Sequence, residues 1–348
     1  MKSLQNKHKD HAYYDKITIK IYTQGVIIQL SLVEKLYSLI IFFAVIIGLS
    51  IGQFDTIRNN AETYIVPLLV VMLYITFLQI PMEGITNAFK NIRFTFTTVT
   101  MNFLWTPILA WVLASLFLAN HPALYIGFIM LMVTPCTDWY LIFTGMAKGN
   151  VALSSAILPL NLLLQVVLLP VYLLTFAGTT GVIELSFLAK SIVIVLLIPF
   201  VFAFLTKMVL KNKPQLIEKL LSNLSVLPII FLSLAIVAMF ASQGQLLLNH
   251  LDLMWKITIP ILLFFIINFI IGQKVGQLMN FKQAEKVSLS LTTLARNSPI
   301  ALAIAMTAFP DQPLIALTLV IGPLLELPIL AMITQLLLFI SKKVLPLR

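Results

Sequence analysis

Charged residues and cysteine are scarce in this chain. Asp, Glu, Lys and Arg make up 10% of its 348 residues, against about 25% in a typical soluble protein, whereas 60% are hydrophobic. The single cysteine excludes a fold held together by internal disulfides. The H-E-x-x-H motif of zinc peptidases and the phosphate-binding loop of nucleotide hydrolases are also absent from the sequence. A soluble enzyme with one membrane anchor is excluded as well, because the apolar runs leave no stretch for a second folded domain.

Long apolar runs are what the chain has instead. Ten runs reach the length of roughly 18 residues that a helix needs to cross a bilayer. They cover residues 34–53, 64–85, 94–118, 123–147, 151–177, 188–210, 220–243, 253–274, 284–309 and 313–340. Polar residues separate them, among them Asn59-Asn60, Ser242-Gln243-Gly244 and Pro310-Asp311. The sequence therefore predicts an all-α membrane protein with ten transmembrane helices.

The basic residues indicate how these helices are oriented. If the chain alternates sides, 19 of its 23 Lys and Arg residues fall on the side of the N-terminal tail. Only Arg58, Lys190 and Lys256 fall on the other side, and Arg296 lies inside a run. Cytoplasmic loops carry such an excess, so we expect both termini in the cytoplasm of a bacterial-type cell membrane, with no role in nucleic-acid binding. Residues 1–33 are predicted to form a cytoplasmic tail that either lies along the membrane surface or is disordered.

The spacing of prolines indicates two inverted repeats. Pro135 and Pro299 are 164 positions apart, as are Pro159 and Pro323, and each pair occupies matching runs of two five-run halves. The predicted segments are a first repeat at 34–177, a second repeat at 188–340 and a cytoplasmic tail at 341–348. Because proline interrupts a helix, we expect the fourth and ninth runs to break near their middles. Matching broken helices mark the binding site of secondary transporters, so we expect these two to cross there.

Three charged side chains fall inside the apolar runs, each three residues from a proline: Asp138, Arg296 and Glu326. Each costs at least ~2.5 kcal/mol at the centre of a bilayer, so we expect each to face the protein interior. If the broken helices cross, Asp138 and Arg296 can meet. They then form either a structural ion pair or a pair that takes part in transport. In the second case, Asp138 takes up a coupling ion and Arg296 holds an anion or neutralises Asp138. Glu326 is a candidate proton carrier, the alternative being a neutral, hydrogen-bonded core residue.

Two further features carry chemical hypotheses. Cys136 directly follows the predicted break, where it is either a small buried apolar residue or a thiolate that binds a soft, thiophilic species. Residues 48–52, Gly-Leu-Ser-Ile-Gly, match the nucleophile motif of hydrolases, but that motif requires a strand, a turn and a helix. At the end of a membrane run, the two glycines are better explained as a close-packing motif between helices. We therefore predict that the protein is not an enzyme.

Several motifs around the predicted breaks resemble the bile acid:sodium symporter superfamily. Residues 135–139, Pro-Cys-Thr-Asp-Trp, precede the Ala-Lys-Gly-Asn turn at 147–150, and residues 296–299, Arg-Asn-Ser-Pro, resemble the ninth-helix crossing segment. Two further segments resemble the arsenical-resistance (arsenite efflux permease) branch: Leu160-Asn161 with Gln165, and Gly-Pro-Leu-Leu-Glu-Leu-Pro at 322–328.

This resemblance implies ten helices in two inverted five-helix repeats, arranged as a panel domain and a core domain. It also implies that substrate and ions bind where the fourth and ninth helices cross. The arsenite branch requires a fourth-helix cysteine, which Cys136 matches. The sequence departs from that branch at 297–301, which lacks its ninth-helix Glu. It departs from the sodium-coupled branch at Arg296-Asn297, which replaces Gln-Asn, and at Thr292, which replaces Glu.

The sequence thus predicts a secondary active transporter that exports arsenite- or antimonite-type metalloid oxyanions, coupled to protons. The alternative is a cation-coupled transporter of a small organic anion, and a third hypothesis is a membrane sensor that moves nothing. Besides the substrate and the lipid bilayer, no partner, cofactor or resident metal is predicted, and the coupling ion is H⁺ or Na⁺. The predicted substrate-binding and coupling residues are Cys136, Thr137, Asp138, Asn161, Gln165, Arg296, Asn297, Ser298 and Glu326, with Thr134 and Thr292 as candidate ion ligands.

Overall fold

The protein is helical over nearly all of the residues that the structure describes. The computed structural model describes residues 20–23, 26–29, 37–79, 89–137, 139–178, 185–224, 226–249 and 251–344. Helices suit a membrane because they satisfy their backbone N–H and C=O groups internally. One hairpin departs from the all-α prediction: β1 (Lys20–Thr23) pairs antiparallel with β2 (Val26–Gln29) inside the predicted N-terminal tail.

The first half of the chain contains α2 (Tyr37–Ile51), α3 (Asp55–Gln79), η1 (Phe89–Asn91), α5 (Ile92–Thr100), η2 (Met101–Trp105), α6 (Thr106–Phe117), α7 (Pro122–Val133), α8 (Trp139–Met146), α9 (Val151–Tyr172) and η3 (Leu173–Ala177). The second half contains α10 (Leu185–Ile192), η5 (Val193–Leu197), α11 (Ile198–Leu210), α12 (Pro214–Leu224), α13 (Leu227–Asn249), α14 (Leu251–Leu278), α15 (Gln283–Leu294), α16 (Ser298–Ala308) and α17 (Pro313–Val344). The segments η2, η3 and η5 are single π-helical turns: η2 joins α5 to α6, η5 joins α10 to α11, and η3 extends α9.

Seven helices in the described part of the chain are long and apolar enough to cross a membrane. They are Asp55–Gln79, Ile92–Phe117, Val151–Phe176, Ser186–Leu210, Gln215–Gln245, Trp255–Leu278 and Pro313–Ser341. Three shorter apolar helices, Leu39–Ile51, Pro122–Val133 and Ser298–Ala308, fall in the first, fourth and ninth predicted runs. The chain is therefore a multi-pass membrane protein, and the two runs expected to break are among those with short helices.

Two predicted separators are wrong, because they lie inside helices. Asn59-Asn60 falls in α3, which begins at Asp55 rather than at residue 64, and Ser242-Gln243-Gly244 falls in α13. An acidic residue in the first turn favours a helix start at Asp55, since it complements the positive end of the helix dipole. Isolated polar residues do not end a helix whose following turns continue to pack.

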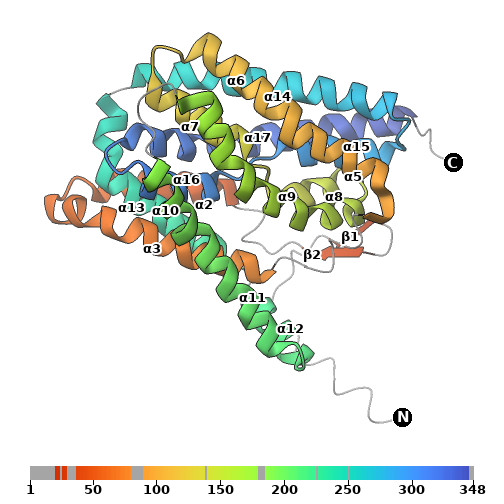
Figure 1. Cartoon of the computed structure of the whole chain (residues 1–348), viewed down its shortest axis with the longest axis horizontal. Helices are drawn as coiled ribbons and strands as arrows, with labels where there is room; N and C mark the ends of the chain where they lie inside the picture. Colours follow the sequence, from red (N-terminus) through yellow and green to blue (C-terminus); the bar gives the residue numbers. More distant parts are fainter. Residues whose placement is uncertain are drawn as a thin grey trace.

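The helices pack in two groups. In one, α13 packs against α2 and α3, and α3 also packs against α11. In the other, α17 packs against α7, α14 and α16, while α14 packs against α6 and α15. Figure 1 shows α2, α3 and α13 together on one side, with α6 and α14 along the opposite edge, and α11 with α12 extending beyond the other helices.

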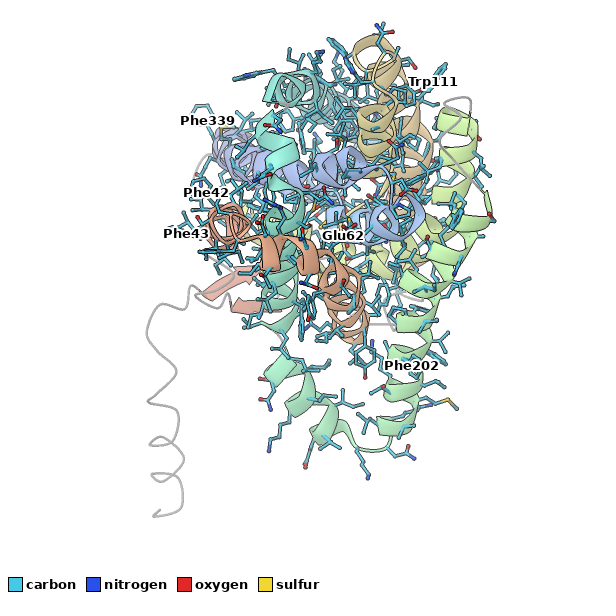
Figure 2. All side chains as sticks on the ribbon, turned by 90° about the vertical axis from the view of Figure 1, so that its left-hand side faces the viewer. Phe42, Phe43, Glu62, Trp111, Phe202 and Phe339 are labelled. Carbon is cyan, nitrogen blue, oxygen red and sulfur yellow. The ribbon has the colours of Figure 1, made fainter. Side chains whose placement is uncertain are left out.

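The periphery is apolar. Phe42, Phe43, Trp111, Phe202 and Phe339 are exposed and project from the outer surface (Figure 2). Large apolar patches are costly in water but favourable against lipid chains, which is where a multi-pass protein places them. The helices inside the assembly are buried on all sides instead. In α7, every residue from Leu124 to Val133 is buried, as expected of a helix that is hydrophobic all round.

The Gly-x-x-x-Gly segment is a packing motif, as predicted. A Cβ atom added at Gly48 would lie 2.7 Å from the Val237 carbonyl oxygen, and one added at Gly52 would lie 2.5 Å from that of Ala241. Both contacts are with α13, so the two glycines let α2 approach α13 at a distance that no other residue permits.

Candidate functional site

Two interrupted helices meet in the middle of the structure. The first interruption separates α7, which ends at Val133, from α8, which begins at Trp139. The second separates α15, which ends at Leu294, from α16, which begins at Ser298. Proline directs the preceding residue to extended geometry, and Thr134 has φ −102° and ψ 99°. The interruptions predicted at Pro135 and Pro299 are therefore both present.

The two interruptions bind each other through their backbones. Pro135 and Arg296 form an isolated antiparallel bridge. The Cys136 N–H donates to the Ala295 carbonyl at 3.0 Å, and the Asn297 N–H donates to the Thr134 carbonyl at 2.7 Å. Peptide groups released by a broken helix cannot stay unpaired inside a membrane. Each interruption thus supplies the hydrogen bonds that the other has lost, which fixes the crossing point.

A cavity of about 100 Å³ lies against this crossing, between α3, α13 and the two interruptions. Among the residues that the structure describes, its polar lining residues are Thr76, Gln79, Thr137 and Asn297, which are uncharged. The Asn297 amide nitrogen donates to the Thr137 hydroxyl at 3.1 Å, while its amide oxygen accepts from the Ile300 N–H at 3.3 Å and so caps α16. Apolar or aromatic residues complete the lining: Met72, Leu73, Trp139, Ile142, Pro228, Ile229, Leu232, Pro299 and Ile300.

Arg296 does not line that cavity; its side chain points into the protein. The guanidinium donates from Nη1 to the Met132 carbonyl at 2.9 Å and from Nε to the Leu294 carbonyl at 3.1 Å. Nη2 donates to the Thr293 carbonyl and, at 3.5 Å, to the Asn102 amide oxygen. The side chain is 2% exposed. These contacts occupy four of the five guanidinium N–H groups.

Glu326 on α17 forms a hydrogen bond with the interruption between α15 and α16. Its Oε1 accepts a hydrogen bond from the Arg296 backbone N–H at 2.8 Å, and the residue is 4% exposed. That N–H has no helical carbonyl to bind because α15 has already ended. Glu326 therefore contacts the backbone of Arg296 rather than its guanidinium. Within the described residues, the salt bridge that is found joins Arg58 and Asp55.

A group of buried amide side chains lies between the long helices Ile92–Phe117 and Val151–Phe176. Asn102, in the π-helical turn η2, donates to the Asn161 amide oxygen at 3.4 Å. The Asn161 amide nitrogen and both amide atoms of Gln165 have no hydrogen-bond partner among the described residues, although both side chains are fully buried. An unpaired buried amide costs ~1–3 kcal/mol, so these atoms mark a place where water or a polar solute would be bound.

The remaining predicted residues are distributed around the crossing. Cys136 is buried beside the cavity-lining Thr137 but does not itself line the cavity, and Ser298 is buried in the first turn of α16. The hydroxyls of Thr134 and Thr292 each donate to a carbonyl of their own helix, at 2.9 Å and 2.7 Å respectively. Asp138 lies outside the described residues, so its pairing with Arg296 stays a prediction.

Sequence reasoning missed three polar residues near the crossing. Thr76 and Gln79, one helical turn apart on α3, line the cavity. Asn268 on α14 is buried, accepts from the Trp105 ring N–H at 3.1 Å and donates to the Thr293 carbonyl. All three are polar residues inside apolar runs, which is the sequence signal that could have identified them.

Comparison with known proteins agrees with the motifs at the crossing. The profile of the Sodium Bile acid symporter family matches residues 66–250, just over half of the chain. The chain belongs to the sodium bile acid symporter family. It is thus a transporter of this family. The match begins within α3 and ends just after α13, the two helices that form one wall of the cavity.

Three similar proteins are distant in sequence but cover most of the chain. Arsenical-resistance protein Acr3 of Corynebacterium glutamicum is 23% identical over 80% of this chain and 79% of its own length. Acr3 of Alkaliphilus metalliredigens is 22% identical over 85% of this chain and 90% of its own length. The uncharacterized protein YbaS of Bacillus subtilis is 24% identical over 81% of this chain and 90% of its own length.

Proposed function

We propose that this protein is a secondary active transporter that exports arsenite- or antimonite-type metalloids from the cytoplasm, coupled to protons. In this proposal the chain forms ten membrane helices in two inverted five-helix repeats, at 34–177 and 188–340. Both termini lie in the cytoplasm, and the protein catalyses no chemical reaction.

The small size of the cavity and the hydroxyl and amide groups in its lining are the observations that carry this proposal. A volume of about 100 Å³ suits a solute of few heavy atoms, whereas drug-sized ligands occupy ~300–1,000 Å³. Arsenous acid is small, bears hydroxyl groups and is largely uncharged near neutral pH. The hydroxyl and amide groups of Thr76, Gln79, Thr137 and Asn297 match those hydroxyls as hydrogen-bond partners. The names of two relatives, both arsenical-resistance proteins, support the same substrate class.

Cys136 supplies the chemical selectivity in this proposal. Trivalent arsenic and antimony are soft and bind thiolates in preference to oxygen ligands. The cysteine adjoins Thr137 in the extended segment that walls the cavity, and its thiol forms no disulfide. A shift of this segment would bring the thiol to the cavity.

The packing of the helices supports alternating access as the mechanism. One wall of the cavity comes from α3 and α13, and the other from the interrupted helices. These walls belong to different groups of packed helices. If one group rocks against the other, the cavity opens first to one side of the membrane and then to the other, which is how inverted-repeat transporters work.

The second candidate is a cation-coupled transporter of a small organic anion. The description of the family favours it, since other members carry bile acids with sodium. The site offers this candidate less support, because Arg296, the cation nearest the crossing, directs its guanidinium to backbone carbonyls rather than to the cavity.

Flux into proteoliposomes tests the proposal. We expect the purified protein to catalyse counterflow of arsenite, and a pH gradient rather than a sodium gradient to drive accumulation. Cys136→Ser should abolish arsenite counterflow, whereas Ala301→Ser, which adds a hydroxyl at another buried position near the crossing, should retain it. Counterflow of an organic anion with no response to arsenite would replace this proposal with the second candidate.

A further inference from the structure

The guanidinium of Arg296 lies at the carbonyl ends of two half-helices. Met132 belongs to the last turn of α7, and Thr293 and Leu294 belong to the last turn of α15. Carbonyls in the last turn of a helix have no helical N–H partner and carry the negative end of the helix dipole. All three accept hydrogen bonds from Arg296.

The other groups around this guanidinium also favour a positive charge. The Asn102 amide contributes a carbonyl oxygen at 3.5 Å. The ring of Phe264 faces the guanidinium, with its centroid 5.5 Å from Cζ, and aromatic faces attract cations. Helix ends and unwound carbonyls of this kind coordinate the coupling cation in transporters built from broken helices. The surroundings are therefore those of a cation site.

We propose that Arg296 is a tethered cation that permanently fills this site. The wild-type protein then binds no free cation there, and a variant with a small side chain at position 296 gains a binding site for a small monovalent cation. Guanidinium is the best fit because it reproduces the planar set of donors, and smaller cations such as ammonium or sodium fit less well. One consequence rests on the proposed function: since Arg296 occupies this site, the transporter does not couple transport to a free cation bound there.

Thermal unfolding of the purified protein in detergent tests the proposal without any transport assay. We expect Arg296→Ala to melt at a lower temperature than the wild type, and millimolar guanidinium to raise its melting temperature in a saturable way, since a ligand that binds the folded state stabilises it. Choline at equal ionic strength should not do so. Leu294→Ala also removes buried side-chain atoms from this region but leaves Arg296 in place. Neither this control nor the wild type should respond to guanidinium.

Two further variants keep the test decisive if Arg296→Ala does not fold. Arg296→Lys retains a positive charge on the carbonyls, whereas Arg296→Met has similar length without charge. We expect the Lys variant to melt at a higher temperature than the Met variant. Equal or reversed melting temperatures, or a guanidinium response no larger than that of the wild type, would overturn the proposal. Because these readouts do not involve arsenite, absence of arsenite flux in the wild type would count against the proposed function alone.

Discussion

Substitutions at Glu326 separate its structural role from a role in proton coupling. Glu326→Leu removes the acceptor of the Arg296 N–H, a bond of 2.8 Å between residues that are both almost fully buried. A buried donor left without a partner costs ~1–3 kcal/mol, toward the upper end here because the acceptor is a carboxyl oxygen. Glu326→Gln keeps an amide oxygen at the same position. We therefore expect it to lose less than ~1 kcal/mol.

The assay combines unfolding in detergent with transport. At ~2–4 °C per kcal/mol for chains of a few hundred residues, the Leu variant should melt several degrees below the wild type and the Gln variant close to it. The Gln side chain cannot exchange a proton. If Glu326 carries the coupling proton, Glu326→Gln should retain arsenite counterflow but lose accumulation driven by a pH gradient. Equal melting temperatures of the Leu variant and the wild type would refute the structural role, and full pH-driven accumulation by the Gln variant would refute the coupling role.

Three other variants test separate parts of the structure. Gln165→Leu removes two buried amide atoms at which we expect water or a polar solute to bind, so the free energy of unfolding should change by less than ~1 kcal/mol; a rise of ~1–2 kcal/mol by denaturant titration would mean that these atoms are unpaired. Gly52→Val places atoms against the backbone of Ala241 and should lower stability by ~1–3 kcal/mol, unlike Gly178→Ala, whose Cβ meets no described atom within 4 Å. Thr137→Val removes a cavity hydroxyl bonded to Asn297 and should raise the arsenite concentration at half-maximal counterflow, and an unchanged value would place the substrate elsewhere.

The two helix interruptions could be predicted from the sequence because proline acts on its own and the neighbouring residues, whatever the rest of the fold. Pro135 and Pro299 remove an N–H or restrict their neighbours wherever they occur in an apolar run, so both interruptions could be located from composition and spacing alone. The glycines at 48 and 52 were likewise interpretable, since their spacing places both on one helix face.

The directions of the polar side chains could not be obtained in this way. The sequence suggests Arg296 as an anion-binding residue, yet its guanidinium binds carbonyls that become available only where two distant half-helices end together. Thr76 and Gln79 were missed because their function as cavity lining depends on how α3 packs against the crossing. The structure also starts α3 at Asp55 rather than at residue 64, and ends α13 at Asn249 rather than at residue 243. Both helices continue through polar residues because their neighbouring turns still pack against other helices.

Arsenite counterflow by the purified protein in proteoliposomes tests the central claim most directly: a small, uncharged metalloid passes through the cavity at the helix crossing. We expect labelled arsenite to accumulate against unlabelled arsenite without any sodium gradient, Cys136→Ser to abolish this flux and Ala301→Ser to retain it. Counterflow that survives in Cys136→Ser at the wild-type rate, or no arsenite flux from a folded wild-type protein, would contradict it.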